Sequence, residues 1–330
     1  MSEPTLTDSP AGVEPVRPRP STAIEPKRAK PHSDLPARLM TAGVLVPVVI
    51  FLVIRDGLWL LGGIIVLILL GQREFYRLIE GKGAHPLVGF GLSAGAALAL
   101  IQYIGTDYQA NLLMTATLLV VLVAQLGKAK ITESLASVSG TFFGVFYVGW
   151  LLSHAISLRD FEGAVEFHYG KDTIESLKIA PECGIFLMFF SLFTVIWCDA
   201  GAYFGGRVYG KRKLAPAISP GKSIEGAIAG VIGGLLGGIV CKGIFELFWP
   251  ELSTLLSWVA VGVMALLLST AAIIGDLIES LLKRDAEVKD TGRLLPGTGG
   301  VLDRIDSCLL AFPVMYYSLL LYVFWMVAES

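Results

Sequence analysis

The run LSWVAVGVMALLLSTAAIIGDLI, from Leu256 to Ile278, carries a single charged residue, Asp276, close to its carboxyl end. A helix needs about 20 apolar residues to cross the hydrocarbon core of a bilayer, and this run is long enough. Its apolar residues are continuous, whereas those of a membrane β-strand alternate with polar ones, so the run predicts a transmembrane helix. A carboxylate at the end of such a helix is costly enough to indicate a function.

Eight further runs share this composition. The predicted membrane-spanning segments lie at about Arg38–Ile54, Leu58–Leu70, Pro86–Ile104, Ala110–Leu126, Leu135–Leu158, Cys183–Cys198, Gly226–Phe248, Leu256–Ile278 and Cys308–Val327. The second run is short, and we expect it to extend through Glu74 to Leu78 if it spans a membrane. The sequence therefore predicts an all-α polytopic membrane protein with about nine transmembrane helices.

The overall composition agrees with a membrane protein. Hydrophobic residues make up 54% of the 330 and charged residues only 16%, against about 25% charged in soluble domains. A net charge of −2 gives no indication of nucleic acid as a partner. The four cysteines stand far apart in apolar surroundings without a CxxC pair, so they predict buried hydrophobic side chains and no metal site.

The first 36 residues contain eight prolines and no apolar periodicity. Such a segment buries too little surface to offset its chain entropy, so residues 1–36 are predicted to be a disordered cytoplasmic tail. We expect no signal peptide, because the first apolar run follows this long segment and not a short basic start. Residues 37–182 are then predicted to hold about five transmembrane helices, and residues 183–330 a transmembrane catalytic region with two cytoplasmic loops, 199–225 and 279–307.

The distribution of basic residues predicts the orientation. When the loops are assigned alternately to two sides, only five of the 26 Lys and Arg fall opposite the amino-terminal tail: Arg55, Arg159, Lys171, Lys178 and Lys242. Cytoplasmic loops are rich in Lys and Arg, so the amino terminus is predicted to lie inside. Nine spans then place the carboxyl terminus outside. We expect the bacterial cytoplasmic membrane, with the site facing the cytoplasm.

Glycines recur at every fourth residue on one predicted helix: Gly226, Gly230, Gly234 and Gly238. A face of small residues permits close contact with another helix. Packing inside one chain is the favoured interpretation, and a homodimer through the same small-residue face is the alternative.

The loop at residues 199–225 begins with Asp199 at a helix end and gathers basic residues among glycines and prolines. Basic residues in a cytoplasmic loop ordinarily set topology and meet anionic headgroups. The turn after Ser219 indicates more, because it presents a hydroxyl, backbone N–H groups and the Lys222 ammonium, which suit a phosphate. A P-loop is excluded because Pro216 stands where its first glycine would fall.

The loop at residues 279–307 adds carboxylates. Spacings of three, four and seven residues place four polar side chains on one helical face: Asp276, Glu279, Ser280 and Lys283. Asp303 and Asp306 are three residues apart and would also point the same way on a helix. Hard cations such as Mg²⁺ prefer oxygen ligands, so Asp276, Asp303 and Asp306 are predicted to form a metal site.

Basic residues and glycines surround these carboxylates. Lys283, Arg284, Lys289 and Arg304 are able to neutralise phosphate charge, and Gly297, Gly299 and Gly300 allow backbone N–H groups to approach it. Taken singly, each charge fits an interfacial position or an ion pair such as Asp303 with Arg304. Their density beside a membrane favours a site for a metal and phosphates.

At these residues the sequence resembles the phosphatidate cytidylyltransferase family, also called CDP-diacylglycerol synthases. The family signature corresponds here to Ser280, Lys283, Arg284, Lys289, Asp290, Gly292, Pro296, Gly299, Gly300, Asp303, Arg304 and Asp306. An upstream block also fits, with Asp199, Tyr203, Gly206, Gly210, Ser219, Pro220, Lys222, Glu225, Gly226 and the run Gly275, Asp276, Leu277. One position departs: Thr298 stands where the family usually has His, and a threonine hydroxyl donates a hydrogen bond but carries no charge.

The resemblance implies that CTP and phosphatidic acid react to give CDP-diacylglycerol and pyrophosphate, with Mg²⁺ and a second cation such as K⁺. It implies catalytic roles for Asp276, Asp303, Lys222 and Lys283. The residues implied to bind substrate are Asp199, Tyr203, Ser219, Lys222, Ser280, Lys283, Arg284, Lys289, Gly299, Gly300 and Arg304. A phosphate monoester is already largely anionic at pH 7, so the reaction needs alignment and charge neutralisation more than a strong base.

Two alternative functions would give similar features in a sequence. A CTP-dependent lipid kinase would need the same spans and metal but would release CDP in place of pyrophosphate. A secondary transporter would also have many spans and acidic residues, although its charges are expected near the bilayer midplane on broken helices. Here the charges lie at span ends and in loops, which favours the enzyme.

Overall fold

The computed structural model describes residues 35–127, 132–292, 294 and 299–329. The predicted tail therefore lies almost wholly outside the described residues, as does Thr298. The chain divides into Met1–Asp34 and a unit of Leu35–Ser330, and all that follows concerns the second unit.

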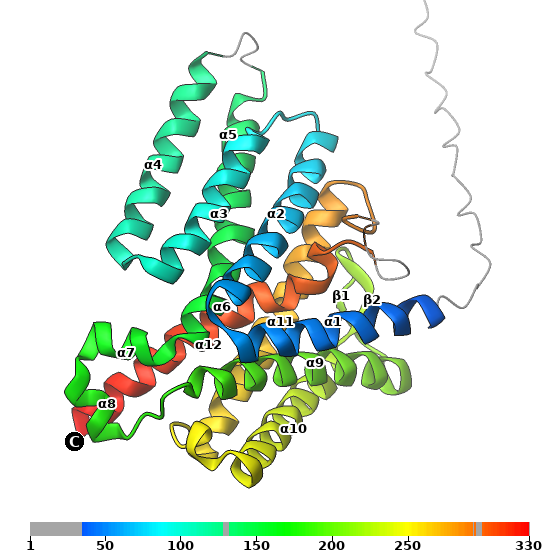
Figure 1. Cartoon of the computed structure of the whole chain (residues 1–330). Coiled ribbons are helices and arrows are strands. Elements are labelled where there is room, and N and C mark those ends of the chain that lie inside the picture. Colours follow the sequence, from blue (N-terminus) through cyan, green and yellow to red (C-terminus); the bar gives the residue numbers. More distant parts are fainter. Residues whose placement is uncertain (1–34, 128–131, 293, 295–298, 330) are drawn as a thin grey trace, which may run out of the picture. The chain divides into compact units, whose positions relative to one another are not determined.

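Helices dominate the described residues, and Figure 1 shows their arrangement. Their order is α1 (Leu35–Arg55), α2 (Gly57–Gly81), α3 (Val88–Ile104), α4 (Asp107–Leu126), α5 (Ser134–Gly144), η1 (Val145–Trp150), α6 (Leu151–Arg159), α7 (Phe161–Tyr169), α8 (Lys171–Leu177), α9 (Cys183–Tyr209), α10 (Ile224–Phe248), η2 (Pro250–Ser253), α11 (Trp258–Asp285) and α12 (Leu302–Glu329). A hairpin of β1 (Lys213–Ala215) and β2 (Ser219–Ser223) precedes α10.

The predicted fold class is confirmed. Among the described residues, seven helices are long and apolar enough to cross a membrane, and two shorter apolar helices lie at Met40–Arg55 and Val88–Ile104. Together they match the nine predicted runs. The second run does extend beyond Leu70, because α2 continues to Gly81 and includes Glu74.

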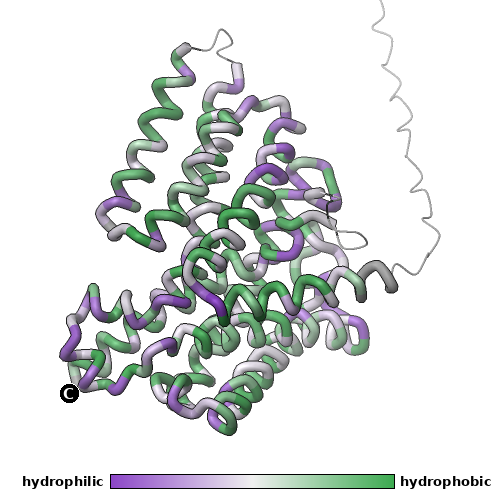
Figure 2. Tube along the Cα trace, in the orientation of Figure 1, coloured by the Kyte–Doolittle hydropathy of each residue, from purple (hydrophilic) through white to green (hydrophobic). Residues whose placement is uncertain are grey.

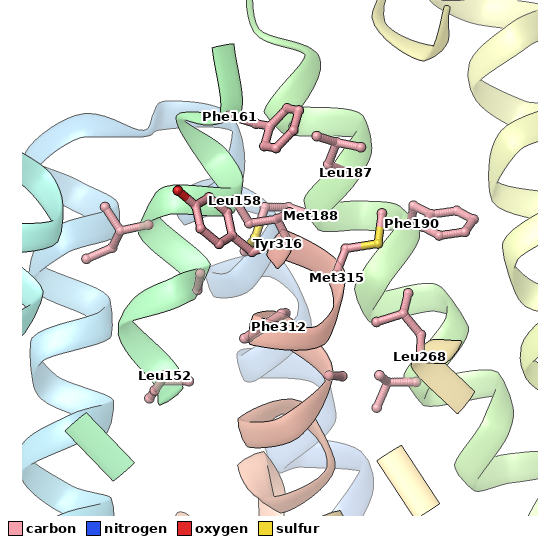
Figure 3. Packing of buried hydrophobic residues seen from close by; sticks show 14 of the residues in the cluster. Leu152, Leu158, Phe161, Leu187, Met188, Phe190, Leu268, Phe312, Met315 and Tyr316 are labelled. Atoms are coloured by element: carbon pink, nitrogen blue, oxygen red, sulfur yellow. The ribbon is translucent and has the colours of Figure 1, made fainter. Parts of the chain in front are cut away.

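Many apolar side chains on the helices are exposed, and Figure 2 shows hydrophobic residues along most of the helices. Ile228, Ile232 and Leu236 on α10 are about half exposed, and Val123 on α4 is 65% exposed. Outward apolar side chains satisfy a helix in lipid, where all its backbone polar groups bond within the helix. The interior is filled by side chains of α6, α9, α11 and α12, among them Leu152, Phe190, Leu268 and Met315, which are labelled in Figure 3.

The glycine face of α10 packs inside the chain. A Cβ added at Gly230 would lie 3.1 Å from the Cys198 carbonyl oxygen of α9, and one at Gly234 would overlap the Ser269 hydroxyl of α11. The favoured interpretation is therefore confirmed for these two glycines. Any homodimer would need another surface for its contact.

Two local features depart from the predicted helices. The fifth span changes from α5 to a π-helical turn, η1, before continuing as α6. The first site loop contains the antiparallel hairpin β1–β2, in which Lys213 pairs with Ser223 and Ala215 with Ser219. Strands this short among glycines and prolines leave no alternating pattern to recognise.

Candidate active site

A cavity of about 540 Å³ lies between the β2–α10 junction and helices α9, α11 and α12. Its lining includes Asp199, Tyr203, Lys222, Asp276, Asp303 and Arg304, all of which were predicted for the site, as was Asp306, which also lines it. Arg207 lines it too, although the sequence analysis did not single it out. The structure therefore brings both predicted loops to one cavity.

Lys222 connects the two loops. Its Nζ lies 2.7 Å from Asp276 Oδ2 and 3.4 Å from Ser280 Oγ, both on α11. The following residue, Ser223, ends β2 and caps α10 by accepting a hydrogen bond from the Gly226 N–H at 3.1 Å. The hairpin and this N-cap together fix the direction in which Lys222 leaves the backbone.

Glu225 holds the rest of the hairpin loop. Its carboxylate accepts hydrogen bonds from the backbone N–H groups of Lys211 and Arg212, and Oε1 lies 2.9 Å from Arg212 Nε. Glu225 is in the first turn of α10, where a negative charge is favourable. The position of Lys222 is therefore set from both ends of the loop.

Three carboxylates meet beside the cavity: Asp276 and Asp306, which line it, and Glu279, which is buried behind the lining. One oxygen from each lies within 4.8 Å of the other two. We call them the acidic cluster. At an effective dielectric constant near 20, two charges at this separation repel by roughly 3 kcal/mol. Lys222 offsets part of this repulsion through Asp276, and Lys283 offsets part through its contact with Glu279.

The acidic cluster fits a hard cation. Its donor set is oxygen only, and the Asp276 side chain is 38% exposed, so a ligand can reach it. Glu279 Oε1 is buried without a hydrogen-bond partner among the described residues. Buried polar atoms are normally satisfied, so this oxygen is available to a cation.

Asp303, predicted as a metal ligand, has a different environment. Its Oδ1 lies 2.8 Å from Lys283 Nζ, and its Oδ2 accepts hydrogen bonds from the Gly300 N–H at 2.7 Å and from the Thr291 N–H and hydroxyl at 3.1 Å each. Both oxygens are thus already engaged. This geometry favours Glu279 over Asp303 as the third member of the metal site.

Other predicted residues lie at the edge of the site. Arg284 donates to the carbonyl oxygens of Ile218 and Val288, which ties the hairpin to the end of α11. Lys289 is exposed, and neither it nor Ser219 is part of the cavity lining. Asp199 Oδ1 accepts a hydrogen bond from the Ser307 hydroxyl at 3.4 Å, which joins α9 to α12.

The predicted glycines Gly299 and Gly300 allow the backbone to approach the Asp303 carboxylate closely. Gly299 has φ +93°, a conformation that other residues rarely adopt, and an added Cβ would lie 2.7 Å from Asp303 Oδ2. Gly300 donates its N–H to the same oxygen. They therefore order Asp303 in this structure.

Two residues of the amino-terminal helices were missed by the sequence analysis. Glu74 on α2 is 4% exposed, and its Oε2 accepts a hydrogen bond from the Thr291 hydroxyl. Tyr147 in η1 is 3% exposed, and its hydroxyl has no hydrogen-bond partner among the described residues. π-Helical turns often occur at functional sites, but no sequence pattern marked this one.

Comparison with known proteins agrees with this geometry. The cytidylyltransferase family model matches residues 36–322, which is most of the chain. The chain belongs to this family. Cytidylyltransferases transfer a nucleotidyl group, so the protein is an enzyme and the transporter alternative is wrong.

Individual relatives of this cytidylyltransferase carry a more specific name. A phosphatidate cytidylyltransferase of Synechocystis sp. is 32% identical over 293 residues, which cover 86% of this chain and 96% of that protein. One of Brucella suis is 33% identical over 285 residues, with 86% and 93% covered. One of Haemophilus influenzae reaches 48% identity over 141 residues, 42% of this chain and 46% of that protein.

Proposed function

We propose that this cytidylyltransferase is a phosphatidate cytidylyltransferase, which transfers the cytidylyl group of CTP to phosphatidic acid. A phosphate oxygen of phosphatidic acid attacks the α-phosphorus of CTP, and the bond from that phosphorus to the β-phosphate oxygen breaks. The products are CDP-diacylglycerol and pyrophosphate. The full-length similarity to proteins of that name supports this proposal.

The observation that carries the proposal is the charge arrangement in the cavity at the ends of α9, α11 and α12. It combines an oxygen-only acidic cluster with the cations Lys222, Arg207 and Arg304. Such a site neutralises phosphate charge on two sides. Alignment and neutralisation are the main requirements of phosphoryl-type transfer, because the attacking phosphate is already anionic.

The residues divide into two roles in this proposal. Asp276, Glu279 and Asp306 would hold Mg²⁺, which supplies charge neutralisation to the phosphates when bound. Lys222 reaches into the cavity from β2 while paired with Asp276. A phosphate takes over this pairing, and Lys222 then orients the substrate. A second cation such as K⁺ is part of the same proposal.

The site is proposed to face the cytoplasm of a bacterial cell, in the cytoplasmic membrane. The excess of Lys and Arg on the side of the amino-terminal tail supports this orientation. A carboxyl-terminal reporter fusion that is active only outside the cytoplasm would agree with it. Cytoplasmic activity of that reporter would refute the predicted nine-span topology.

Product analysis tests the function. Purified protein in detergent or vesicles is incubated with CTP, Mg²⁺ and phosphatidic acid, and released pyrophosphate is measured together with lipid-bound cytidine. Stoichiometric release of both is expected. Release of CDP with a diacylglycerol acceptor, and no pyrophosphate, would show the CTP-dependent lipid kinase instead.

A further inference from the structure

Glu74 lies on α2, yet its hydrogen bonds are with residues more than 200 positions later in the chain. Its Oε2 accepts the Leu302 N–H at 2.8 Å and the Thr291 hydroxyl at 3.2 Å. A buried carboxylate is costly unless hydrogen bonds satisfy it. We therefore infer that the Glu74 carboxylate is buried because it orders the residues that donate these hydrogen bonds.

The first of these contacts caps α12. Leu302 is the first residue of that helix, and its N–H is among the groups that have no partner within a helix. A negative charge at a helix amino terminus is favourable. Glu74 thus supplies from α2 a cap that usually comes from the adjacent residues.

The second contact passes through Thr291. Its hydroxyl lies 3.2 Å from Glu74 Oε2 and 3.1 Å from Asp303 Oδ2. The Thr291 hydroxyl is therefore within hydrogen-bond distance of both carboxylates and links Glu74 to Asp303. Asp303 in turn pairs with Lys283, which also contacts Glu279 of the acidic cluster. A continuous chain of polar contacts therefore runs from α2 to the metal site.

Two glycines lie so close to the Glu74 carboxylate that a larger residue at either position would clash with it. An added Cβ at Gly292 would overlap Glu74 Oε1, and one at Gly300 would overlap Glu74 Oε2 and the Thr291 hydroxyl. The backbone on both sides of the loop between α11 and α12 approaches this carboxylate as closely as glycine allows. These steric limits are independent of the hydrogen bonds.

We propose that Glu74 is a positioning residue for cytidylyl transfer. It fixes Thr291, Gly292 and Gly300 and the first turn of α12, and through them it sets the places of Asp303, Lys283 and Asp306. This inference rests on the proposed function for its kinetic readout but not for its structural one. Glu74 lies outside the cavity lining, so it acts through these residues and not on substrate.

The test compares Glu74→Ala and Glu74→Gln with two controls on the same helix. Gln72→Ala removes an equally buried polar side chain that binds the Gly144 carbonyl oxygen, away from the loop. Glu80→Ala removes an exposed carboxylate. A displacement of about 1 Å at a reacting centre costs on the order of 10²-fold in rate, so we expect Glu74→Ala to lower kcat by about that factor with a smaller change in KM.

Hydrogen exchange gives a readout that needs no substrate. The amides of Thr291, Gly300 and Leu302 should exchange faster in Glu74→Ala, while those of Gln72→Ala and Glu80→Ala should match the wild type. Glu74→Gln keeps an acceptor for the Leu302 N–H and should recover part of both kcat and protection. Thr291→Val, which preserves shape, should lower both without unfolding the chain.

The outcomes are separable. The proposal would be overturned if Glu74→Ala kept wild-type protection of the loop and a kcat within twofold of wild type. If the Ala variant does not fold, the same result in both Glu74→Gln and Thr291→Val would overturn it. An equal loss of kcat in Gln72→Ala would also overturn it, because burial alone would then account for the effect. Absence of pyrophosphate release by the wild type would refute the proposed function and leave the exchange result to decide on Glu74.

Discussion

Two groups of carboxylates at the ends of α11 and α12 differ in how their oxygens are satisfied. The acidic cluster of Asp276, Glu279 and Asp306 receives two lysines and one backbone N–H. The second group, Glu74 and Asp303, which we call the loop anchor, accepts hydrogen bonds from Thr291, Gly300 and Leu302. The first group keeps oxygen lone pairs that can bind a cation, whereas the oxygens of the second group are occupied by hydrogen bonds that stabilise the fold. Carboxylates in one small region thus have two roles: those of the first group suit a metal site, and those of the second order the polypeptide around it.

The largest effect is expected in the acidic cluster. Asp276→Asn removes a charge from the metal site and the partner of Lys222, so we expect pyrophosphate release to fall by about 10³-fold or more. The melting temperature should stay close to wild type, because Asp276 is partly exposed and caps nothing. Asp285→Asn, on the same helix and exposed, is the matched control. Retained activity in Asp276→Asn would remove Asp276 from the metal site.

Asp303→Asn tests the loop anchor directly. The amide offers one acceptor oxygen in place of two and removes one of the two carboxylates that pair with Lys283, so activity and melting temperature should both fall. We expect a loss of activity of about 10²-fold, with faster exchange of the Thr291 and Gly300 amides. If activity disappears while melting temperature and exchange stay unchanged, Asp303 is a metal ligand as the sequence predicted, and the comparison fails.

Glu279→Gln separates the two groups by their response to metal. A ligand of the cation should shift the Mg²⁺ dependence of the rate, so the concentration for half-maximal activity is expected to rise by about tenfold. Asp303→Asn should leave that concentration nearly unchanged. If instead Asp303→Asn raised that concentration and Glu279→Gln did not, Asp303 would be the metal ligand and Glu279 would belong to the loop anchor. Chelation of Mg²⁺ should abolish pyrophosphate release in every variant, and added Mg²⁺ should restore it.

The smallest effect is expected at Thr298, which lies outside the described residues. Because the attacking phosphate is already anionic, no base is needed there. Thr298→His should be tolerated, and Thr298→Ala should cost less activity than Asp303→Asn, within about tenfold, the worth of one hydrogen bond. Initial rates at saturating CTP would check this order. An Ala variant as inactive as Asp303→Asn would show that the site depends on this side chain.

The sequence predicted the parts of the molecule that depend on local composition. A run such as Leu256–Ile278 must be a helix in lipid, and the spacing of Asp276 and Glu279 placed both on one face before the structure did so. The metal site was predicted as Asp276, Asp303 and Asp306 from the spacing of the carboxylates, and the geometry favours Glu279, which the helical spacing had already placed on the same face as Asp276.

Long-range contacts were beyond sequence reasoning. Glu74 lies between Arg73 and Arg77 on α2 and has the pattern of an ordinary interfacial charge, while its partners lie 217 and 228 residues away. Nothing local marks such a pair. The hairpin β1–β2 was missed for a different reason, since its strands are too short to show alternation.

The cap that Glu74 gives to α12 also concerns how the protein is made. The second helix enters the bilayer early in synthesis, and α12 is the last, so the polar contact between them forms only after nearly the whole chain has been inserted. Until then the buried carboxylate lacks the Leu302 N–H, and the cavity lacks Asp303, Arg304 and Asp306. An incomplete chain in the membrane therefore lacks the side chains that α12 contributes to the cavity.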